Sequence, residues 1–246
     1  MSVTVTFAGS GDAFGSGGRL NTCIVVDGPD MRFCVDFGAS SLIALNALGI
    51  DHNTIEAIVI THLHADHAGG ISFLLMDAML GARRQSPLTI IGPPGTERWV
   101  EQATATLFPG SDKMKPRFAL DFVELSNTSA HRHGELAIET MPAVHTPQTM
   151  PTSVRLNIDG KVISYTGDGE WNPHMPALAD GADLLIMECY AFSKPVKYHL
   201  NYPDLEANRA ALNAKRIVLT HMGPDMLAAA RDIPETTAFD GMVITL

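Results

Sequence analysis

Short runs of apolar residues alternate along the chain with longer stretches in which apolar residues recur every three or four positions. The short runs are rich in Val and Ile and are bounded by Gly, Pro or Asp, as β-strands commonly are. They predict strands over Val3–Phe7, Thr22–Val26, Arg32–Asp36, Ala57–Thr61, Leu88–Ile91, Phe118–Glu124, Glu135–Thr140, Ser153–Ile158, Val162–Tyr165, Leu184–Glu188, Ile217–Thr220 and Met242–Thr245. The longer stretches predict helices over Ser40–Leu48, His67–Leu80, Thr96–Leu107, Asn172–Ala179, Pro203–Leu212 and Pro224–Ala230.

The order of these elements indicates the fold class. The first half opens with strands before its helices, and the second half repeats strand pairs followed by helices, with no linker between the halves. Such an order favours sheets enclosed between helical layers, an α/β (α+β) arrangement. We therefore predict one domain over residues 1–246. The polar, turn-rich segment 126–134 is expected to be a surface loop between two strands.

Composition and charge narrow the class of protein. The 246 residues include 17 Lys and Arg against 27 Asp and Glu, which gives a net charge of −10, and 46% of them are hydrophobic. This content supports a folded core, and the negative charge disfavours unspecific binding of nucleic acid or anionic lipid. No apolar run is long enough to span a bilayer, and the first residues resemble a strand rather than a secretion signal. We therefore expect a cytoplasmic protein without membrane association.

Some polar and sulfur-containing residues are expected to have no functional role. Three cysteines cannot form a disulfide framework. Because a cross-strand disulfide is strained, we expect Cys23 and Cys34 to be two half-buried thiols on paired strands. The pair Arg83 and Arg84 is too short for a nucleic-acid track and lacks aromatic neighbours, so we expect a solvated face there. His52 is likewise expected to be solvated.

Three histidines and an aspartate are concentrated between a predicted strand and a predicted helix, at His62, His64, Asp66 and His67. Burying such groups without a partner is costly, whereas a divalent cation satisfies all of them at once. In an extended loop His62 and His64 point to the same side and can chelate one ion. Asp66 and His67 lie beyond the turn and can bind a second one. The segment therefore predicts a centre with two metal ions.

This His-x-His-x-Asp-His motif resembles the signature of the metallo-β-lactamase fold hydrolases, and later segments of the chain complete the resemblance. It covers essentially the whole chain and implies a four-layer αββα sandwich. The ligand set that it implies is His62, His64 and His145 for one ion, Asp66, His67 and His221 for the second, and Asp168 as a bridge. Because the ligands are imidazoles and carboxylates, zinc is the favoured metal, with Mn²⁺ or Fe²⁺ as alternatives.

Further segments resemble the ribonuclease Z branch of these hydrolases, including the Gly-rich turn over 9–22 that precedes the histidine motif. In that branch a glutamate and a histidine form a pair beside the metals, which implies Glu188 and His199 here. The resemblance assigns His199 as the proton donor to the leaving group. Asp36 resembles the family carboxylate that contacts ligand histidines on the side of the ring away from the metal. The alternative interpretation of Asp36 is an ordinary aspartate in a turn. Asp66 is expected to orient the attacking water as well as to bind metal.

Two departures from the family patterns bear on the substrate. Ribonuclease Z has a long arm that grips tRNA, whereas only short connections lie between Asp168 and Glu188 and on the way to His199. Together with the net charge of −10, this makes tRNA an unlikely partner. A class B1 β-lactamase would have a cysteine ligand where this chain has Asp168. We expect a small-molecule ester as the substrate and leave a homodimer open.

These features predict a metal-dependent hydrolase of the phosphodiesterase-like type (EC 3). Two ions about 3.5–4 Å apart lower the pKa of a shared water, and the resulting hydroxide attacks an ester. The favoured substrate is a small phosphodiester, a class that includes cyclic and nucleoside-type esters. One alternative is an aryl sulfate, lactone or β-lactam hydrolysed at the same site. Another is a metal-dependent redox protein, since the same fold hosts di-iron relatives.

Overall fold

Two seven-stranded sheets form the centre of the computed structural model, which describes residues 2–246. The first sheet runs in the order β14 (Met242–Thr245), β1 (Thr4–Gly9), β2 (Cys23–Asp27), β3 (Arg32–Val35), β4 (Ala57–Val59), β5 (Leu88–Gly92) and β6 (Leu120–Glu124). The second runs in the order β13 (Thr236–Thr237), β12 (Ile217–Thr220), β11 (Leu184–Glu188), β10 (Lys161–Tyr165), β9 (Thr152–Ile158), β8 (Leu136–Pro142) and β7 (Ala130–His133). Both sheets contain parallel and antiparallel pairs.

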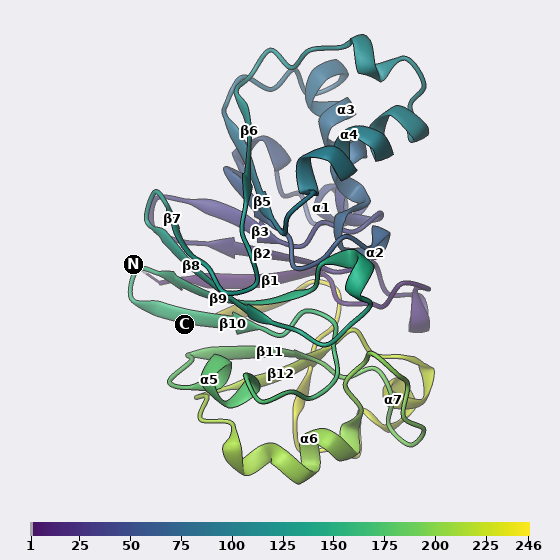
Figure 1. Cartoon of the computed structure of the whole chain (residues 1–246), viewed down its shortest axis with the longest axis vertical. Helices are drawn as coiled ribbons and strands as arrows, with labels where there is room; N and C mark the ends of the chain where they lie inside the picture. Colours follow the sequence, from purple (N-terminus) through teal and green to yellow (C-terminus); the bar gives the residue numbers. More distant parts are fainter. Residues whose placement is uncertain (1) are drawn as a thin grey trace.

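Helices cover the outer faces of the two sheets (Figure 1). Those on the first sheet are α1 (Ser41–Ala47), α3 (Gly70–Leu80) and α4 (Thr96–Leu107), and those on the second are α5 (Met175–Ala179), α6 (Tyr202–Asn208) and α7 (Pro224–Ala229). The short α2 (Ala65–Ala68) lies at the edge where the sheets meet. Turns of 3₁₀ helix occur at Ser16–Gly18, His52–Thr54, Ser111–Lys113, Pro147–Thr149 and Arg209–Ala211. The predicted αββα sandwich is therefore confirmed.

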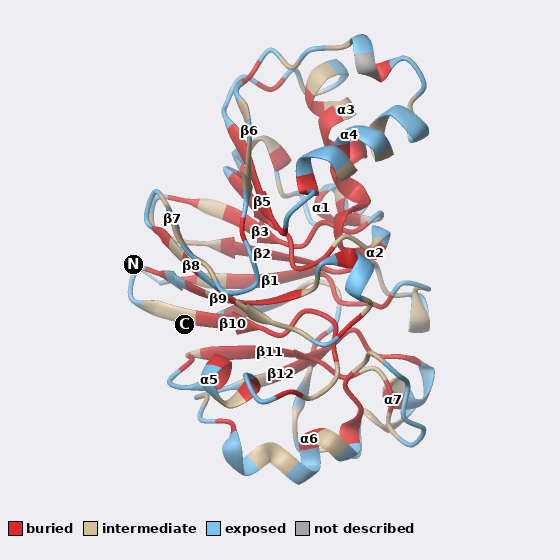
Figure 2. Cartoon of the chain, viewed as in Figure 1, coloured by how far each residue is buried: buried red, intermediate tan, exposed pale blue. Residues whose placement is uncertain are grey.

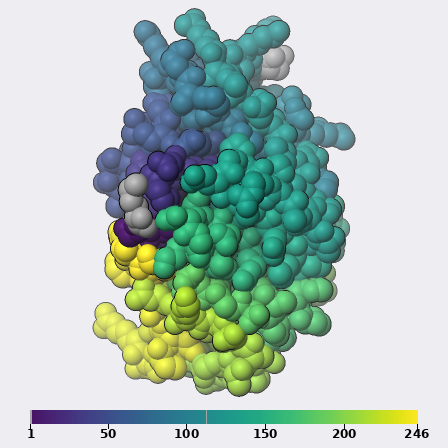
Figure 3. Space-filling view, turned by 90° about the vertical axis from the view of Figure 1, so that its left-hand side faces the viewer, coloured from purple at the N-terminus to yellow at the C-terminus, as the bar shows by residue number. Residues whose placement is uncertain are grey.

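Apolar side chains between the two sheets form the central core, as the buried strands in Figure 2 show. Phe7 and Phe33 from the first sheet pack in one cluster with Leu156, Tyr165 and other residues of the second. Separate apolar clusters lie between each sheet and its helices. The two ends of the chain lie side by side, because β1 pairs with β14, and Figure 3 shows this face of the molecule. This scaffold fixes the strand ends that carry the candidate site.

The structure corrects the sequence-based prediction at four elements. The helix predicted over 203–212 is α6 followed by the 3₁₀ turn at Arg209–Ala211. The helix predicted over 67–80 is two helices, because Gly70 donates its N–H to the carbonyl of Phe37 (2.9 Å) and the helical ladder is interrupted there. The predicted loop over 126–134 contains β7, an edge strand whose polar residues hide its alternation. The two-residue strand β13 was also missed. The remaining predicted strands are confirmed to within about two residues.

Two residues expected to be solvated are buried. Arg84 is only 2% exposed, and its guanidinium donates to the carbonyls of His52, Ile55, Ser86 and Pro87. His52 is also buried and lies 2.8 Å from a carboxylate oxygen on α3. The short basic pair therefore includes a structural residue, because the guanidinium satisfies the buried carbonyls of His52 and Ile55.

Cys23 and Cys34 are free thiols, as predicted, but both are fully buried rather than half-buried. Among residues 2–246 no helix is long and apolar enough to cross a membrane.

We predict that Arg84→Ala lowers the free energy of unfolding by about 3 kcal/mol, because it leaves several buried carbonyls without donors. For a chain of this size the melting temperature should fall by about 6–12 °C. The neighbouring, exposed Arg83 provides the control, and Arg83→Ala should shift the melting temperature by no more than about 2 °C. Equal shifts in the two variants would show that the Arg84 contacts contribute little.

Candidate metal centre

The candidate functional side chains gather where the carboxyl ends of strands from both sheets meet. Parallel strands present their following loops at one edge, which is where α/β sheets commonly bind ligands. Six strands each contribute one residue, which lies at the carboxyl end of the strand or shortly after it. These residues are Asp36 after β3, His62 after β4, His145 after β8, Asp168 after β10, Glu188 at the end of β11 and His221 after β12. Segments that are far apart in the sequence therefore contribute to one site.

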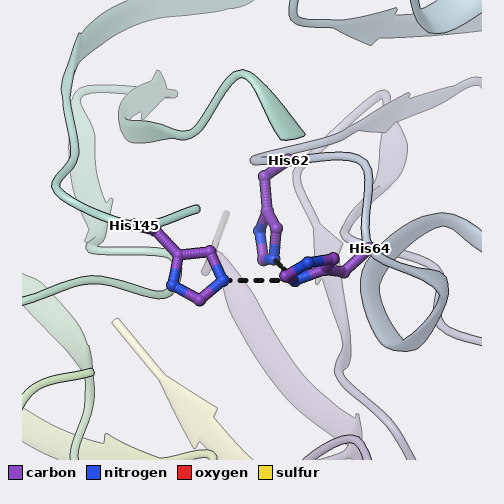
Figure 4. Close-up of side chains that lie close together, drawn as sticks. All are labelled: His62, His64 and His145. Carbon is purple, nitrogen blue, oxygen red and sulfur yellow. Dashed lines mark hydrogen bonds between the residues drawn. The ribbon is translucent and has the colours of Figure 1, made fainter. Parts of the chain in front are cut away.

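The first cluster consists of His62, His64 and His145, whose rings converge in Figure 4. His64 Nδ1 lies 3.2 Å from His62 Nε2 and 3.1 Å from His145 Nε2. His62 and His145 are buried, and His64 is partly exposed. Each of the three rings directs one nitrogen at a common point. No carboxylate of the described residues lies between these three nitrogens.

The second cluster consists of Asp66, His67, Asp168 and His221, all of which are buried. His67 Nε2 and His221 Nε2 lie 3.3 Å apart. Asp66 Oδ2 is 3.3 Å from the first of these nitrogens and 3.2 Å from the second. Asp168 Oδ1 is 3.3 Å from His67 Nε2, and its Oδ2 is 3.4 Å from His221 Nε2. The four side chains thus enclose a second point from different directions.

Asp168 lies between the two clusters. Its Oδ2 is 3.9 Å from His62 Nε2 and 4.0 Å from His145 Nε2, while its contacts to the second cluster are shorter. Its Oδ1 is buried and has no hydrogen-bond partner. A buried carboxylate oxygen without a partner is costly unless an ion or water satisfies it.

The spacing of the donor atoms tests whether the residues fit metal ions. Two ligand atoms at 2.0–2.1 Å from one tetrahedral ion lie about 3.3 Å apart. The nearest donor separations in both clusters are 3.1–3.4 Å. Donor type, burial and spacing therefore fit one divalent cation in each cluster.

The ring nitrogens that point away from the clusters are held from behind. His67 Nδ1 lies 2.7 Å from a carboxylate oxygen of Asp36, which also accepts from the backbone and side chain of Thr61. His145 Nδ1 donates to the carbonyl of Tyr198 (2.6 Å). Such contacts fix the tautomer and the orientation of ligand imidazoles. Asp36 thus lies behind His67, as the resemblance implied, and its role in holding a ligand histidine stays a prediction.

Close backbone packing fixes the helix that carries Asp66 and His67. A Cβ atom on Gly38 would lie 2.1 Å from the carbonyl oxygen of Asp66, and one on Gly70 would lie 2.2 Å from the carbonyl of Gly38. Phe37 donates its N–H to the carbonyl of His67 at 2.6 Å. Side chains at these two glycines would separate the β3 loop from α2 and displace both donors.

Glu188 and His199 form the pair that the resemblance implied. Nδ1 of His199 contacts Oε1 of Glu188, and the fully buried Glu188 also accepts from the backbone N–H of Gly169 (2.7 Å). His199 is partly exposed and lies 4.0 Å from Asp168. With Nδ1 engaged, Nε2 is the nitrogen left for a ligand or substrate.

The electrostatics of the site favour bound cations. Burial lowers the pKa of His62 well below its usual value, which leaves the ring neutral with a lone pair to share. Burial opposes ionisation of Asp168, but His221 and His67 hold its pKa well below the usual range. Burial also opposes protonation of His221, but Asp168 raises the pKa of His221 to about 10. Protons and metal ions therefore compete for the same carboxylate charge.

Sequence reasoning missed the residues that hold the site through backbone groups. Glu170 accepts the N–H of Tyr198 at 2.7 Å and so fixes the carbonyl that orients His145. Asp240 accepts from Ser10, whose carbonyl in turn accepts the N–H of His221 at 3.1 Å. No residue-type signal marks such contacts, because the functional atom is a peptide carbonyl.

Comparison with known proteins places the chain in a family. Residues 3–243 match the family model described as "Anti-Pycsar protein Apyc1". Ribonuclease Z of Mycobacterium marinum is 25% identical over 253 residues, which covers 94% of this chain and 90% of that protein.

Two solved structures show the same fold. The metallo-β-lactamase fold protein YhfI from Bacillus subtilis is 20% identical, covers 100% of both chains and has a TM-score of 0.78. A diphosphatase of the PhnP family is 20% identical, covers 98% of this chain and 97% of the other, and has a TM-score of 0.77. These matches confirm the resemblance on which the site residues were assigned. The chain is thus a hydrolase of the metallo-β-lactamase fold, related to ribonuclease Z, and it belongs to the family of the anti-Pycsar protein Apyc1.

Proposed function

We propose that the protein is a hydrolase with two divalent metal ions that cleaves small phosphodiesters, cyclic nucleoside-type esters first among them. The observation that carries this proposal is the position of Asp168 between two clusters whose donor spacings fit one cation each. His62, His64 and His145 would hold one ion, Asp66, His67 and His221 the other, and Asp168 both. The imidazole and carboxylate donors favour zinc, and they also suit Mn²⁺ or Fe²⁺.

The chemistry of the site divides between the ions and the chain. Two divalent cations held by these residues would lower the pKa of water toward neutrality and would neutralise charge on the phosphoryl oxygens. Asp66 lines the cavity at the site, so its carboxylate can orient the attacking water. His199 lines the same cavity with Nε2 free, and Glu188 holds its ring from behind. His199 is therefore placed to give a proton to the departing oxygen.

The size of the site supports a small substrate. The cavity that contains the donors has a volume of about 360 Å³, near the lower end of the range of ligand pockets. Between Asp168 and the start of β11 the structure has only α5 and short loops, and residues 189–201 connect β11 to α6, so neither segment forms a long arm. A net charge of −10 also disfavours a polyanion such as tRNA. The free, buried thiols suit our expectation of a cytoplasmic enzyme.

The first test is metal content. Protein purified without chelators should contain about two equivalents of transition metal per chain by elemental analysis. Removal of the metal should lower the melting temperature, because it leaves buried carboxylates and imidazoles without their cation. Metal-free protein that gains no thermal stability on zinc titration would refute the two-metal assignment.

Asp168 provides the second test. Asp168→Ala removes the carboxylate placed between the clusters, so metal content should fall to one equivalent or less and hydrolysis should be lost. Asp36→Ala should weaken metal binding less, by about 10–100-fold, since it removes a contact behind one ring. Asp121→Ala, at an exposed position on β6, is the control and should keep both equivalents. Mild, equal effects of the first two changes would contradict a bridging role.

The third test uses the leaving group. His199→Ala should reduce kcat/KM by about 10²–10⁴-fold on a phosphodiester with an alkoxide leaving group, which needs a proton. The reduction should be much smaller on a nitrophenyl ester, because nitrophenolate leaves without protonation. Metal content should stay at the wild-type value. Loss of metal would instead make His199 a ligand, and equal losses on both esters would indicate a role in binding.

The substrate class itself is open to a direct assay. A panel of phosphodiester, phosphomonoester, sulfate, lactone and cephalosporin compounds should show the highest kcat/KM for the phosphodiester. Preference for any other ester would overturn the proposed substrate while leaving the metal assignment intact.

A further inference from the structure

The cavity at the metal centre has a wall that the proposed chemistry does not use. Donor residues line one part of it, and apolar or aromatic side chains line the remainder, above all Phe14, Tyr190 and Val196. The Tyr190 ring lies 4.7 Å from the ring of His199, so this wall begins beside the proposed proton donor. A ligand with a charged end and a flat apolar end matches such a cavity.

Phe14 differs from the other side chains of this wall in its exposure to solvent. Its side chain is 85% exposed, the highest value among the large hydrophobic residues of the described chain. It belongs to the Gly-rich turn over 9–22, which precedes the histidine motif in sequence and borders the candidate metal centre in the structure. Exposed aromatic rings at a ligand cavity are typical of groups that pack on a bound ligand.

The turn that carries Phe14 is held rigidly before any ligand binds. The buried carboxylate of Asp12 accepts the N–H of Phe14 at 3.2 Å and that of Ser16 at 2.8 Å. It also accepts the Ser16 hydroxyl at 2.7 Å. Asp240 fixes the far end of the turn by accepting the N–H of Leu20 at 2.8 Å. The ring of Phe14 is therefore presented at the cavity by an ordered segment, which reduces the entropy lost on binding.

We infer that Phe14 is a specificity-determining residue that stacks on the planar heteroaromatic ring of a nucleotide substrate. This inference rests on the proposed function, because it places the phosphodiester at the donor clusters and the base on the apolar wall. Stacking on an aromatic side chain is tolerant of base identity, since every base has a π-face. Phe14 therefore selects for the presence of a base and accepts purines and pyrimidines alike.

The test compares a substrate that has a base with one that lacks it. Zinc-loaded wild type, Phe14→Ala and Phe14→Trp are assayed on a 3′,5′-cyclic nucleoside monophosphate and on the 3′,5′-cyclic phosphate of methyl riboside. Phe14→Ala should lower kcat/KM on the nucleotide by about 5–150-fold, mainly through KM, and leave the abasic ester nearly unchanged. Phe14→Trp should retain activity on both.

Phe73 supplies the matched control. It is an exposed phenylalanine on α3 whose ring packs against Phe108 outside the cavity, and Phe73→Ala should leave both reactions unchanged. Equal losses of Phe14→Ala on the two esters would overturn the inference and give Phe14 a role in shaping the turn. No loss on the nucleotide would overturn it as well. Circular dichroism and metal content confirm that each variant is folded.

A binding measurement separates this inference from the proposed function. If the zinc-loaded wild type hydrolyses neither ester, the proposed function fails, and calorimetric titration with a nucleoside 5′-monophosphate still tests the stacking. A dissociation constant at least five-fold weaker for Phe14→Ala supports the inference, and equal constants overturn it. If Phe14 instead contacts another copy of the chain, Phe14→Ala will dissociate an oligomer in sedimentation experiments without changing nucleotide affinity.

Discussion

The carboxylate of Asp168 interacts with more of the site than any other side chain named above. It lies within 4.0 Å of ring nitrogens on five histidines, namely His62, His67, His145, His199 and His221. A buried anion surrounded by imidazoles is stable only with cations or protons to balance it. The strand ends, the close glycine contacts near α2 and the carboxylates behind the rings all serve to keep these groups at donor spacing. The fold can thus be understood as a frame that places positive charge around one carboxylate.

The parts of the site that the sequence made predictable are those with dense local patterns. His62, His64, Asp66 and His67 are close in the chain, so their residue types and spacing sufficed. His145, Asp168 and His221 are separated by long segments, and only the resemblance to a family connected them. Their proximity depends on the order of strands in the second sheet, which no local pattern encodes.

Other features left no trace in the sequence because they depend on backbone atoms. The carbonyl of Tyr198 orients His145, and any residue type would offer the same carbonyl. Arg84 looked like a surface charge because its partners are carbonyls brought together by tertiary structure. The polar strand β7 was missed since an edge strand needs no apolar face on its outer side.

Three of the six non-glycine residues with a positive φ angle among residues 2–246 lie at the candidate site. Asp36, Tyr198 and His221 are not glycines, yet their φ angles are 56°, 68° and 56°. Each such conformation costs about 1–3 kcal/mol and persists only where surrounding contacts impose it. The buried cores on both faces of each sheet supply that constraint. The packing of the sandwich therefore holds the strained backbone in place, and the backbone in turn fixes the directions in which the donor atoms point.

The pairing of β1 with β14 has a consequence for the order in which the molecule matures. The carbonyl of Ser10, just after β1, accepts the N–H of His221, and Ser10 itself donates to Asp240. The contacts of β1 therefore depend on residues that are synthesised more than 200 positions later. During synthesis on the ribosome, β1 leaves the exit tunnel long before its partner strand exists, and its free edge is open to wrong pairings. Such non-local contacts also make folding slow. Ser10 can therefore hold His221 in place only after β12 and Asp240 have been synthesised, so the candidate site is completed late in folding.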